Sequence, residues 1–284
     1  MKLAMETHPL TRFYEEAEGY ELIKRAGFDG VDLSFYWGAV KLDDRYRAAA
    51  RETRRLLDEA GLTCVQAHAP FTNKTTNSGF AYGMKMDVSE PDFLELVRSM
   101  EYAAIAGARQ IIVHGILVPE GARTAASMDY NYRFYRALAS YAKEFGIKIA
   151  IENQIMTVFT NPFMLSEMLR RLDDPDTFCA CIDVGHAQLC RVQPQNFIRD
   201  MTPGSVQALH IQDNFGSADD HLLPGHGILK WDEIMTSLAD VDYQGDFTLE
   251  LTGYWKAFGA EELHIAMALA CAVGRKLMSK IDAS

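Results

Sequence analysis

The stretch Glu-Phe-Gly-Ile-Lys-Ile-Ala-Ile-Glu-Asn, residues 144–153, contains the pattern that decides the fold of this chain. Gly146 follows an amphipathic segment, and a glycine after the last helical turn adopts the left-handed conformation that other residues resist. Lys148–Ile151 is apolar and short, which predicts a buried strand. Glu152 and Asn153 then end the strand with polar side chains. The unit is therefore a helix end, a strand and a polar strand end.

The same unit recurs along the whole chain. Helix ends of the form Ala-Gly occur within residues 25–27, 59–61 and 105–107. The predicted strands are Leu3–Met5, Gly30–Leu33, Thr63–Ala67, Gln110–Val113, Lys148–Ile151, Thr177–Ile182, Val206–Ile211 and Phe247–Leu251. The predicted helices include Arg45–Ala60, Pro91–Gly107, Tyr132–Gly146, Phe163–Leu172, Trp231–Leu238 and Glu261–Lys280. Strands that alternate with helices indicate a parallel sheet with helical crossovers.

Two architectures fit this alternation, a barrel and a doubly wound open sheet. An open sheet that binds a nucleotide usually has a glycine-rich first turn. The chain after Leu3–Met5 continues Glu-Thr-His-Pro and has no such turn. No Pro/Gly/Ser-rich linker divides the chain. We therefore expect one α/β domain over residues 1–284, a single (β/α)₈ TIM barrel.

Composition limits the function classes. Hydrophobic residues make up 48% of the 284 residues, which is ordinary for a globular protein. The formal charge is -11 and no block of Lys and Arg occurs, which argues against nucleic acid as the partner. The apolar stretches are too short for a membrane helix, and the N-terminus is no secretory signal, so we expect a cytoplasmic protein. The five scattered cysteines are expected to be reduced.

Histidines and carboxylates follow the predicted strands. Strands three to eight end in His68, His114, Glu152, Asp183 with His186, His210, and Glu250, respectively. A lone histidine at such a place is more often structural, and Asp183 could cap a helix. Glu152 and Glu250 follow buried runs, where a carboxylate needs a cation. Because the carboxyl ends of barrel strands form one face, we predict that these side chains converge there.

The chemistry of this set indicates a divalent metal. Carboxylate oxygens and imidazole nitrogens suit manganese, zinc, cobalt or magnesium, and no soft ligand requires copper or an iron–sulfur cluster. Such an ion polarises a carbonyl group, and two carboxylates beside it can move protons on opposite sides of a substrate.

Four short motifs resemble those of the xylose isomerase-like barrels, which include ketose 3-epimerases, sugar phosphate isomerases and endonuclease IV. They are Ile-Glu-Asn at 151–153, Ile-Asp-Val-Gly-His at 182–186, His-Ile-Gln-Asp at 210–213 and Leu-Glu-Leu at 249–251. The resemblance implies one divalent metal, with manganese expected first, held by Glu152, Asp183, His210 and Glu250. It also implies that Glu152 and Glu250 are the catalytic acid and base.

The resemblance further implies a small-molecule sugar or sugar phosphate as substrate, an isomerisation or epimerisation through a cis-enediolate, and a homo-oligomer. His186 corresponds to a residue that contacts a substrate hydroxyl group. We add His68, His114 and Trp37 as candidate substrate-binding residues. Trp37 and Trp255 follow the second and eighth strands, where an aromatic ring could either stack on a sugar or pack in the core.

Two alternatives stay open. The endonuclease IV branch binds three zinc ions through nine side chains, and Asp219 and His221 complete the same nine residue types in this chain. They are therefore candidates for an additional metal site, and an abasic-site endonuclease is the first alternative. Against it, strand six ends Asp-Val-Gly-His where the nucleases have Asp-Thr-Cys-His, and the charge is strongly negative. The second alternative is a metal-dependent dehydratase that acts on a cyclic polyol or a keto acid.

Overall fold

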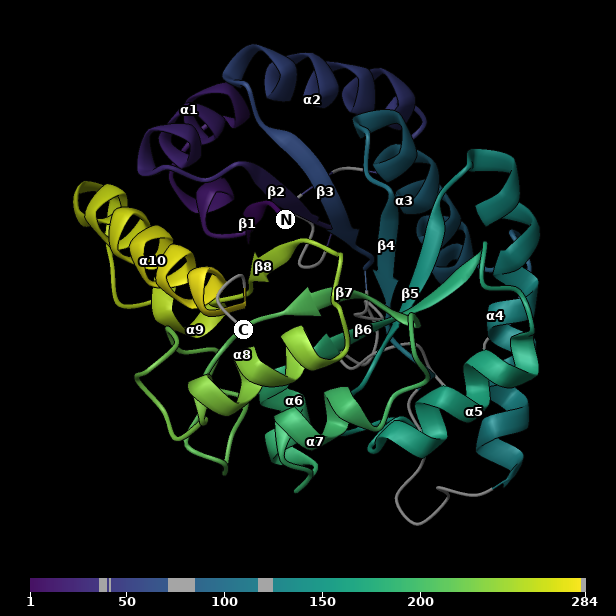
Figure 1. The fold of residues 1–284 in the computed structure, drawn as a ribbon. Helices are drawn as coiled ribbons and strands as arrows, with labels where there is room; N and C mark the ends of the chain where they lie inside the picture. Colours follow the sequence, from purple (N-terminus) through teal and green to yellow (C-terminus); the bar gives the residue numbers. More distant parts are fainter. Residues whose placement is uncertain (36–39, 41, 71–84, 117–124, 282–284) are drawn as a thin grey trace.

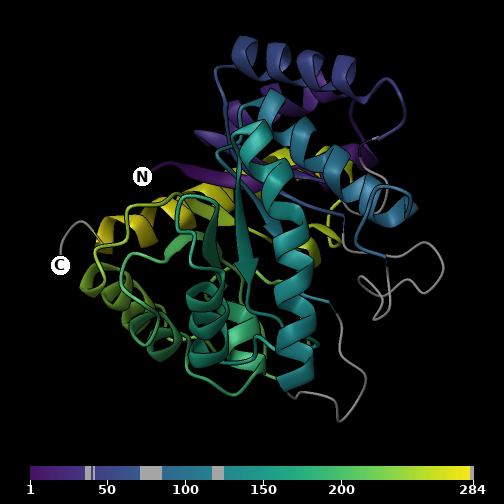
Figure 2. The same ribbon diagram turned by 90° about the vertical axis from the view of Figure 1, so that its right-hand side faces the viewer.

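The computed structural model describes residues 1–35, 40, 42–70, 85–116 and 125–281. Its strands form a barrel surrounded by helices, seen along the barrel axis in Figure 1 and from the side in Figure 2. The strands are β1 (Leu3–Glu6), β2 (Gly30–Ser34), β3 (Thr63–His68), β4 (Gln110–Val113), β5 (Lys148–Glu152), β6 (Phe178–Asp183), β7 (Val206–His210) and β8 (Phe247–Leu249).

The strand order shows how the sheet closes. The sheet runs β7-β6-β5-β4-β3-β2-β1-β8, and every neighbouring pair is parallel. At the open edge, Ile211 forms a parallel bridge with Leu249, and its backbone N–H donates to Thr248 O at 2.9 Å. The sheet is therefore a nearly closed (β/α)₈ TIM barrel, as the sequence predicts.

Helices cover the outside of the barrel (Figure 1). The longer ones are α1 (Glu16–Ala26), α2 (Tyr46–Ala60), α3 (Pro91–Ala106), α4 (Ala125–Phe145), α5 (Pro162–Leu172), α8 (Trp231–Asp240) and α10 (Ala260–Ile281). Short helical segments are η1 (Leu10–Arg12), α6 (Val184–Leu189), α7 (Pro194–Arg199) and α9 (Thr252–Trp255). The four glycines predicted as helix ends all have positive φ, between 67° and 102°. Only the α4 start differs much, because the helix begins seven residues before the predicted Tyr132.

The core has two parts. Large apolar side chains fill the space between the sheet and the helices, for example Phe93, Phe134 and Phe197. A separate cluster of small or slender side chains consists of Ile112, Ala150, Cys179, Cys181 and Ala208. These come from neighbouring strands and alternate with residues of the first cluster, so they line the barrel interior. None of the five cysteines, all of which lie in the described residues, forms a disulfide.

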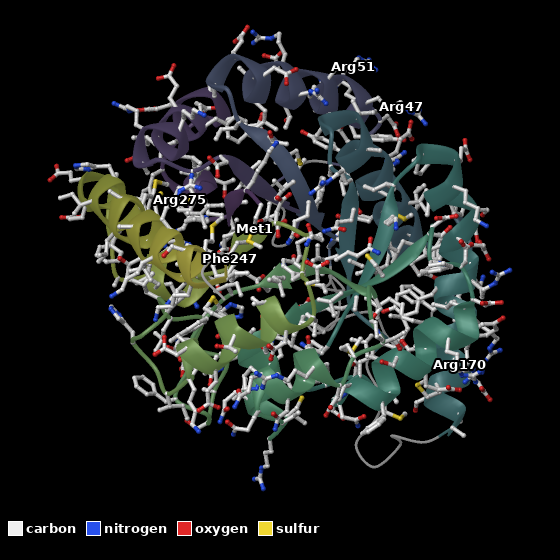
Figure 3. The ribbon with its side chains drawn as sticks, viewed as in Figure 1. Met1, Arg47, Arg51, Arg170, Phe247 and Arg275 are labelled. Atoms are coloured by element: carbon white, nitrogen blue, oxygen red, sulfur yellow. The ribbon has the colours of Figure 1, made fainter. Side chains whose placement is uncertain are left out.

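The outer surface carries charged side chains that pair locally. Arg47 and Arg51 on α2 and Arg170 on α5 lie at the periphery in Figure 3. Arg170 Nε is 2.6 Å from Glu167 Oε2 on the same helix. In the part of the chain that the structure describes, no helix is long and apolar enough to cross a membrane.

Candidate functional site

The site is built by the period-two alternation of side chains along each strand. Ala150 faces the barrel interior, so Glu152, two residues further on, points the same way at the carboxyl end. By the same rule, Asp183 points to the same side as the interior residue Cys181, and His210 points to the same side as Ala208. Each of these polar side chains is buried, and the parallel strands bring them to one end of the barrel.

Four of the predicted residues form one tight group. Ligand atoms of Glu152, Asp183, His210 and Glu250 all lie within 4.8 Å of one another. Within this group, His210 Nδ1 is 3.0 Å from Glu152 Oε1 and 3.2 Å from Glu250 Oε2. Glu152 ends β5, whereas Glu250 follows β8, so the two carboxylates approach the imidazole from different parts of the barrel wall.

The pKa values in this group follow from burial and from the imidazoles. Burial alone raises the pKa of Glu152, but His210 and His114 outweigh it and hold the pKa well below its usual value. Burial likewise opposes ionisation of Glu250, and His210 and His221 bring its pKa below the usual range. Asp183 differs, because burial raises its pKa to about 6 and Glu152 and Glu250 add to the rise. The group thus favours negative charge on both glutamates.

The two carboxylate oxygens of Asp183 differ in their contacts, because only one of them caps a helix. Its Oδ1 accepts a hydrogen bond from His186 N at 2.7 Å and so caps α6, the structural role considered from the sequence. Asn153 fixes the Asp183 backbone by accepting from its N–H at 2.8 Å and donating to its carbonyl at 2.9 Å. Asp183 Oδ2 is buried and accepts no hydrogen bond from the residues that the structure describes.

A second group lies beside the first and contains His186, Asp219 and His221. Asp219 Oδ2 is 3.2 Å from His186 Nε2 and 3.1 Å from His221 Nε2. The Gln212 side-chain amide donates to Asp219 Oδ1 at 2.9 Å. Although burial lowers the pKa of His221, the adjacent Asp219 raises it to about 10. His186 therefore faces a carboxylate, whereas its predicted contact with a substrate hydroxyl group stays a prediction.

His68, at the end of β3, and His114, which follows β4, lie beside the first group. Together with the two groups they form one cluster of side chains. His114 Nε2 is 2.7 Å and His68 Nε2 is 3.6 Å from Glu152 Oε2. Burial lowers the pKa of His114, which favours a neutral imidazole that can act as a ligand. The structure thus brings together nine of the ten candidate residues, and Trp37 lies outside the described residues.

The loop after β7 depends on Asp213. Its Oδ1 accepts from the backbone N–H groups of Asn214 and Leu229, at 3.0 and 3.2 Å. Its Oδ2 accepts from Gly225 N at 2.8 Å and from Trp231 Nε1 at 2.9 Å. Because both ends of the loop meet at this buried carboxylate, the segment that carries Asp219 and His221 has a fixed path.

Position 185 requires a glycine because a neighbouring side chain lies too close for a Cβ atom, and not because of its backbone angles. A Cβ on Gly185 would lie 2.2 Å from the side-chain carbon of the Gln212 amide, the group that holds Asp219. We expect Gly185→Ala to displace Gln212 and to lower the free energy of unfolding by about 1–3 kcal/mol, since overpacking a close-packed site strains its neighbours. Thermal or denaturant unfolding measures this loss. Gly259→Ala is the control, because its Cβ would meet only the flexible end of Glu262 at 3.1 Å. Equal stability of the two variants would contradict the role given to Gly185.

The structure decides between the two positions left open for Trp255 and adds Asp32 to the site. Trp255 is 1% exposed and its Nε1 donates to Glu6 Oε1 at 3.1 Å, so it packs in the core. Asp32 in β2 is not among the residues predicted from the sequence, yet its Oδ2 lies 3.2 Å from His210 Nε2. A carboxylate inside the apolar run Gly30–Leu33 is the signal that could have identified it.

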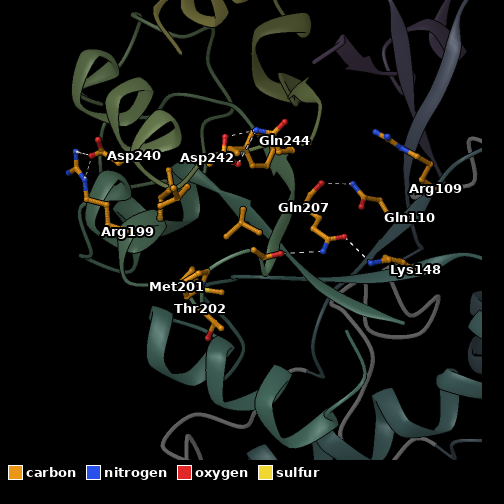
Figure 4. Close-up of a pocket in the computed structure, with 17 residues that line it drawn as sticks. Arg109, Gln110, Lys148, Arg199, Met201, Thr202, Gln207, Asp240, Asp242 and Gln244 are labelled. Atoms are coloured by element: carbon orange, nitrogen blue, oxygen red, sulfur yellow. Dashed lines mark hydrogen bonds and ion pairs between the residues drawn. The ribbon is translucent and has the colours of Figure 1, made fainter. Parts of the chain in front are cut away.

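A cavity of about 710 Å³ lies at the opposite, amino-terminal end of the strands (Figure 4). Its polar side chains already bind one another: Gln110 Nε2 donates to Gln207 O at 2.9 Å, and Lys148 Nζ is 3.1 Å from Gln207 Oε1. Residues at this end of a TIM barrel usually serve stability. The clustered carboxylates and imidazoles make the carboxyl-terminal end the candidate site instead.

The residues at the carboxyl-terminal end fit a divalent metal. The four-residue group offers three carboxylates and one imidazole, a donor set that manganese, zinc, cobalt and magnesium accept. The buried Asp183 Oδ2, which accepts no hydrogen bond from the described residues, is the kind of atom that a cation would satisfy. The second group offers a further carboxylate between two imidazoles.

Comparison with known proteins gives the following matches in sequence. The family model described as xylose isomerase-like TIM barrel matches residues 20–269. The "Uncharacterized protein y4fM" of Sinorhizobium fredii is 26% identical over 266 residues, which are 84% of this chain and 82% of that protein. The 2-oxo-tetronate isomerase of Haemophilus influenzae is 25% identical over 244 residues, 83% of this chain and 88% of that protein.

Solved structures match over the whole length. A D-tagatose 3-epimerase-like protein superposes with a TM-score of 0.79 at 19% identity, covering 100% of this chain and 99% of that chain. The IOLI protein, solved with a bound zinc atom, superposes with a TM-score of 0.74 at 16% identity, covering 99% of each chain. At these identities the likeness concerns the fold.

Proposed function

Because the chain belongs to the xylose isomerase-like TIM barrel family, we propose that it is a divalent-metal-dependent isomerase or epimerase of sugars or sugar phosphates. The name of the Haemophilus relative, a 2-oxo-tetronate isomerase, adds sugar acids with a 2-oxo group to the substrate class. We propose that Glu152 and Glu250 move the protons, and that Glu152, Asp183, His210 and Glu250 hold the metal.

One observation carries the proposal. Glu152 and Glu250 come from β5 and from the end of β8, yet each places an oxygen within 3.2 Å of the same atom, His210 Nδ1. Two carboxylates that converge in this way can address opposite sides of a substrate bound between them. Both are buried, and both have pKa values held below the usual range, so each can accept a proton.

The proposed reaction consists of two proton transfers, one by each glutamate. One of Glu152 and Glu250 removes the proton from the carbon beside the substrate carbonyl and leaves a cis-enediolate. The other carboxylate, which is ionised at rest and first takes up a proton from solvent, returns that proton, to the opposite face for epimerisation or to the neighbouring carbon for isomerisation. A bound divalent ion would supply polarisation of the carbonyl and the adjacent hydroxyl group. In this proposal, His68, His114 and His186 contact the remaining hydroxyl groups.

Solvent isotope exchange tests the proposal whichever product is formed. The metal-loaded protein is incubated in D₂O with ketoses, ketose phosphates and 2-oxo sugar acids, and the substrates are followed by NMR. We expect deuterium to appear at the carbon beside the carbonyl in at least one substrate, at a rate that depends on protein concentration. No exchange with any member of the panel, under any of the four metals, would contradict the proposed function.

A second candidate function rests on the second group. His186, Asp219 and His221 provide ligands beyond those that one metal needs, and His68 and His114 stand next to Glu152. A site with several zinc ions suits hydrolysis of a phosphodiester. Cleavage of DNA that contains an abasic site, with a zinc-loaded protein, is the assay for this candidate. The charge of -11 and the paired surface arginines favour the small-molecule function.

A further inference from the structure

Asp32 is a buried carboxylate to which the proposed function gives no role. It lies within β2 and is 1% exposed. Gln66 Nε2 donates to its Oδ2 at 2.8 Å, and His210 Nε2 is 3.2 Å from the same oxygen. Among the residues that the structure describes, no Lys or Arg pairs with it, and its Oδ1 has no hydrogen-bond partner. A buried carboxylate is costly, so its pairing with one imidazole calls for an explanation.

Three of the other four imidazoles in the cluster are oriented by the backbone. Their Nδ1 atoms lie close to carbonyl oxygens: His68 to Ala69 O at 2.8 Å, His186 to Asn153 O at 3.0 Å and His221 to Glu250 O at 3.0 Å. A carbonyl oxygen only accepts, so in each case Nδ1 carries the hydrogen. The Nε2 atom of each of these rings then faces a carboxylate of the site.

His210 has the reverse arrangement. Its Nδ1 faces Glu152 and Glu250, so Nε2 is the nitrogen that needs an orienting acceptor. This Nε2 points into the barrel interior, where the strand carbonyls are engaged in the sheet and a side chain must supply the acceptor. β2, which is separated from β7 by β1 and β8 in the closed sheet, supplies Asp32.

We propose that Asp32 is a positioning residue for the metal site. It accepts the Nε2–H of His210, which keeps the lone pair of Nδ1 directed at the metal, and Gln66 holds the carboxylate in place. The inference rests on the proposed metal site. Outer carboxylates that bind a metal-ligating histidine typically strengthen metal affinity by 10- to 100-fold. Asp32 touches no substrate atom in this role and acts only through His210.

Asp32→Asn is the direct test, because the amide has the size of the carboxylate but can donate to His210 Nε2 and so turn the ring hydrogen toward the metal. Isothermal titration of the chelator-treated full chain with Mn²⁺ gives the affinity, and the histidine Nε2–H signal in NMR of the Zn²⁺-loaded protein reports the ring state. We expect at least a tenfold weaker Kd and loss of the hydrogen-bonded Nε2–H signal. Asp246→Asn is the matched control at the opposite barrel end, where the carboxylate accepts from Lys2 N at 2.8 Å, and it should leave both unchanged.

The outcomes separate this inference from the proposal on which it rests. If the unaltered protein binds no divalent ion, the proposed metal site is wrong. If it binds Mn²⁺ and Asp32→Asn binds equally well, only the role of Asp32 is overturned. Should Asp32→Asn fail to fold, Gln66→Met takes its place, because it removes the amide that holds Asp32 and keeps the charge. A several-fold weaker Kd is then expected, and an unchanged Kd overturns the inference.

Discussion

Glu152→Gln is expected to reduce turnover about a thousandfold or more. The substitution keeps the size of the side chain but removes a group that the proposal uses twice, as proton carrier and as metal ligand. General acid–base groups typically contribute 10²- to 10⁴-fold, and weaker metal binding adds to the loss. Glu250→Gln should have a comparable effect, since Glu250 has the same two proposed roles and lies at a similar distance from His210 Nδ1. Product formation under saturating metal, measured on the substrate found by isotope exchange, gives the change in kcat.

The control for this pair is Glu167→Gln. Glu167 lies on α5, on the outside of the barrel, with its side chain 42% exposed and paired with Arg170. It should keep full activity. A Glu152 or Glu250 variant that retained most of the turnover would show that the two carboxylates do not share the proton transfer, and the proposed mechanism would have to be abandoned.

Removal of metal is expected to lower the melting temperature by roughly 10 °C. Glu152, Asp183 and Glu250 are all buried within one group, and their mutual repulsion is relieved by a bound cation. A ligand present at a thousand times its Kd stabilises the folded state by about 4 kcal/mol, and 1 kcal/mol shifts the melting temperature of a chain of this size by roughly 2–4 °C. Thermal unfolding before and after chelation, with each divalent ion restored in turn, measures the effect.

Elemental analysis of the same protein, purified without chelators, gives the number and identity of the bound ions. About one manganese, cobalt or magnesium per chain would support the four-residue group of Glu152, Asp183, His210 and Glu250. Two or three zinc ions would mean that the histidine-rich second group is also occupied, and abasic-site cleavage would become the leading assay. Asp183→Asn should lose most of the thermal increment. An unchanged melting temperature with every ion would refute metal binding.

The strand ends were predictable because two simple regularities act together. Side chains alternate along a strand, and the parallel strands of a barrel share one carboxyl end, so a polar residue after each apolar run belongs to one face. These regularities point to Glu152 and Glu250 before any distance is measured. Asp219 and His221 lie in a loop that has no such regularity, and only the resemblance of the motifs drew attention to them.

The sequence could not show which way these side chains point. Asp32 sits inside a strand, and period-two alternation alone does not say which of the two strand faces is the interior. Trp255 could have faced a substrate or the core, and its burial against Glu6 depends on α9, a helix of four residues that no periodicity reveals. Gly185 must be a glycine because of its contact with the Gln212 side chain, 27 positions further along the chain. Local sequence patterns cannot reveal such a contact.

The distribution of the site over six strands has a consequence for how the protein is made. A nascent chain that has emerged through β4 carries only His68 and His114, and the four-residue group is incomplete until Glu250 has left the ribosome. The barrel itself closes only when β8 meets β7 and β1, through the bridge of Ile211 with Leu249 and the ladder with β1. We therefore expect the proposed metal to bind only after the chain has completed its barrel.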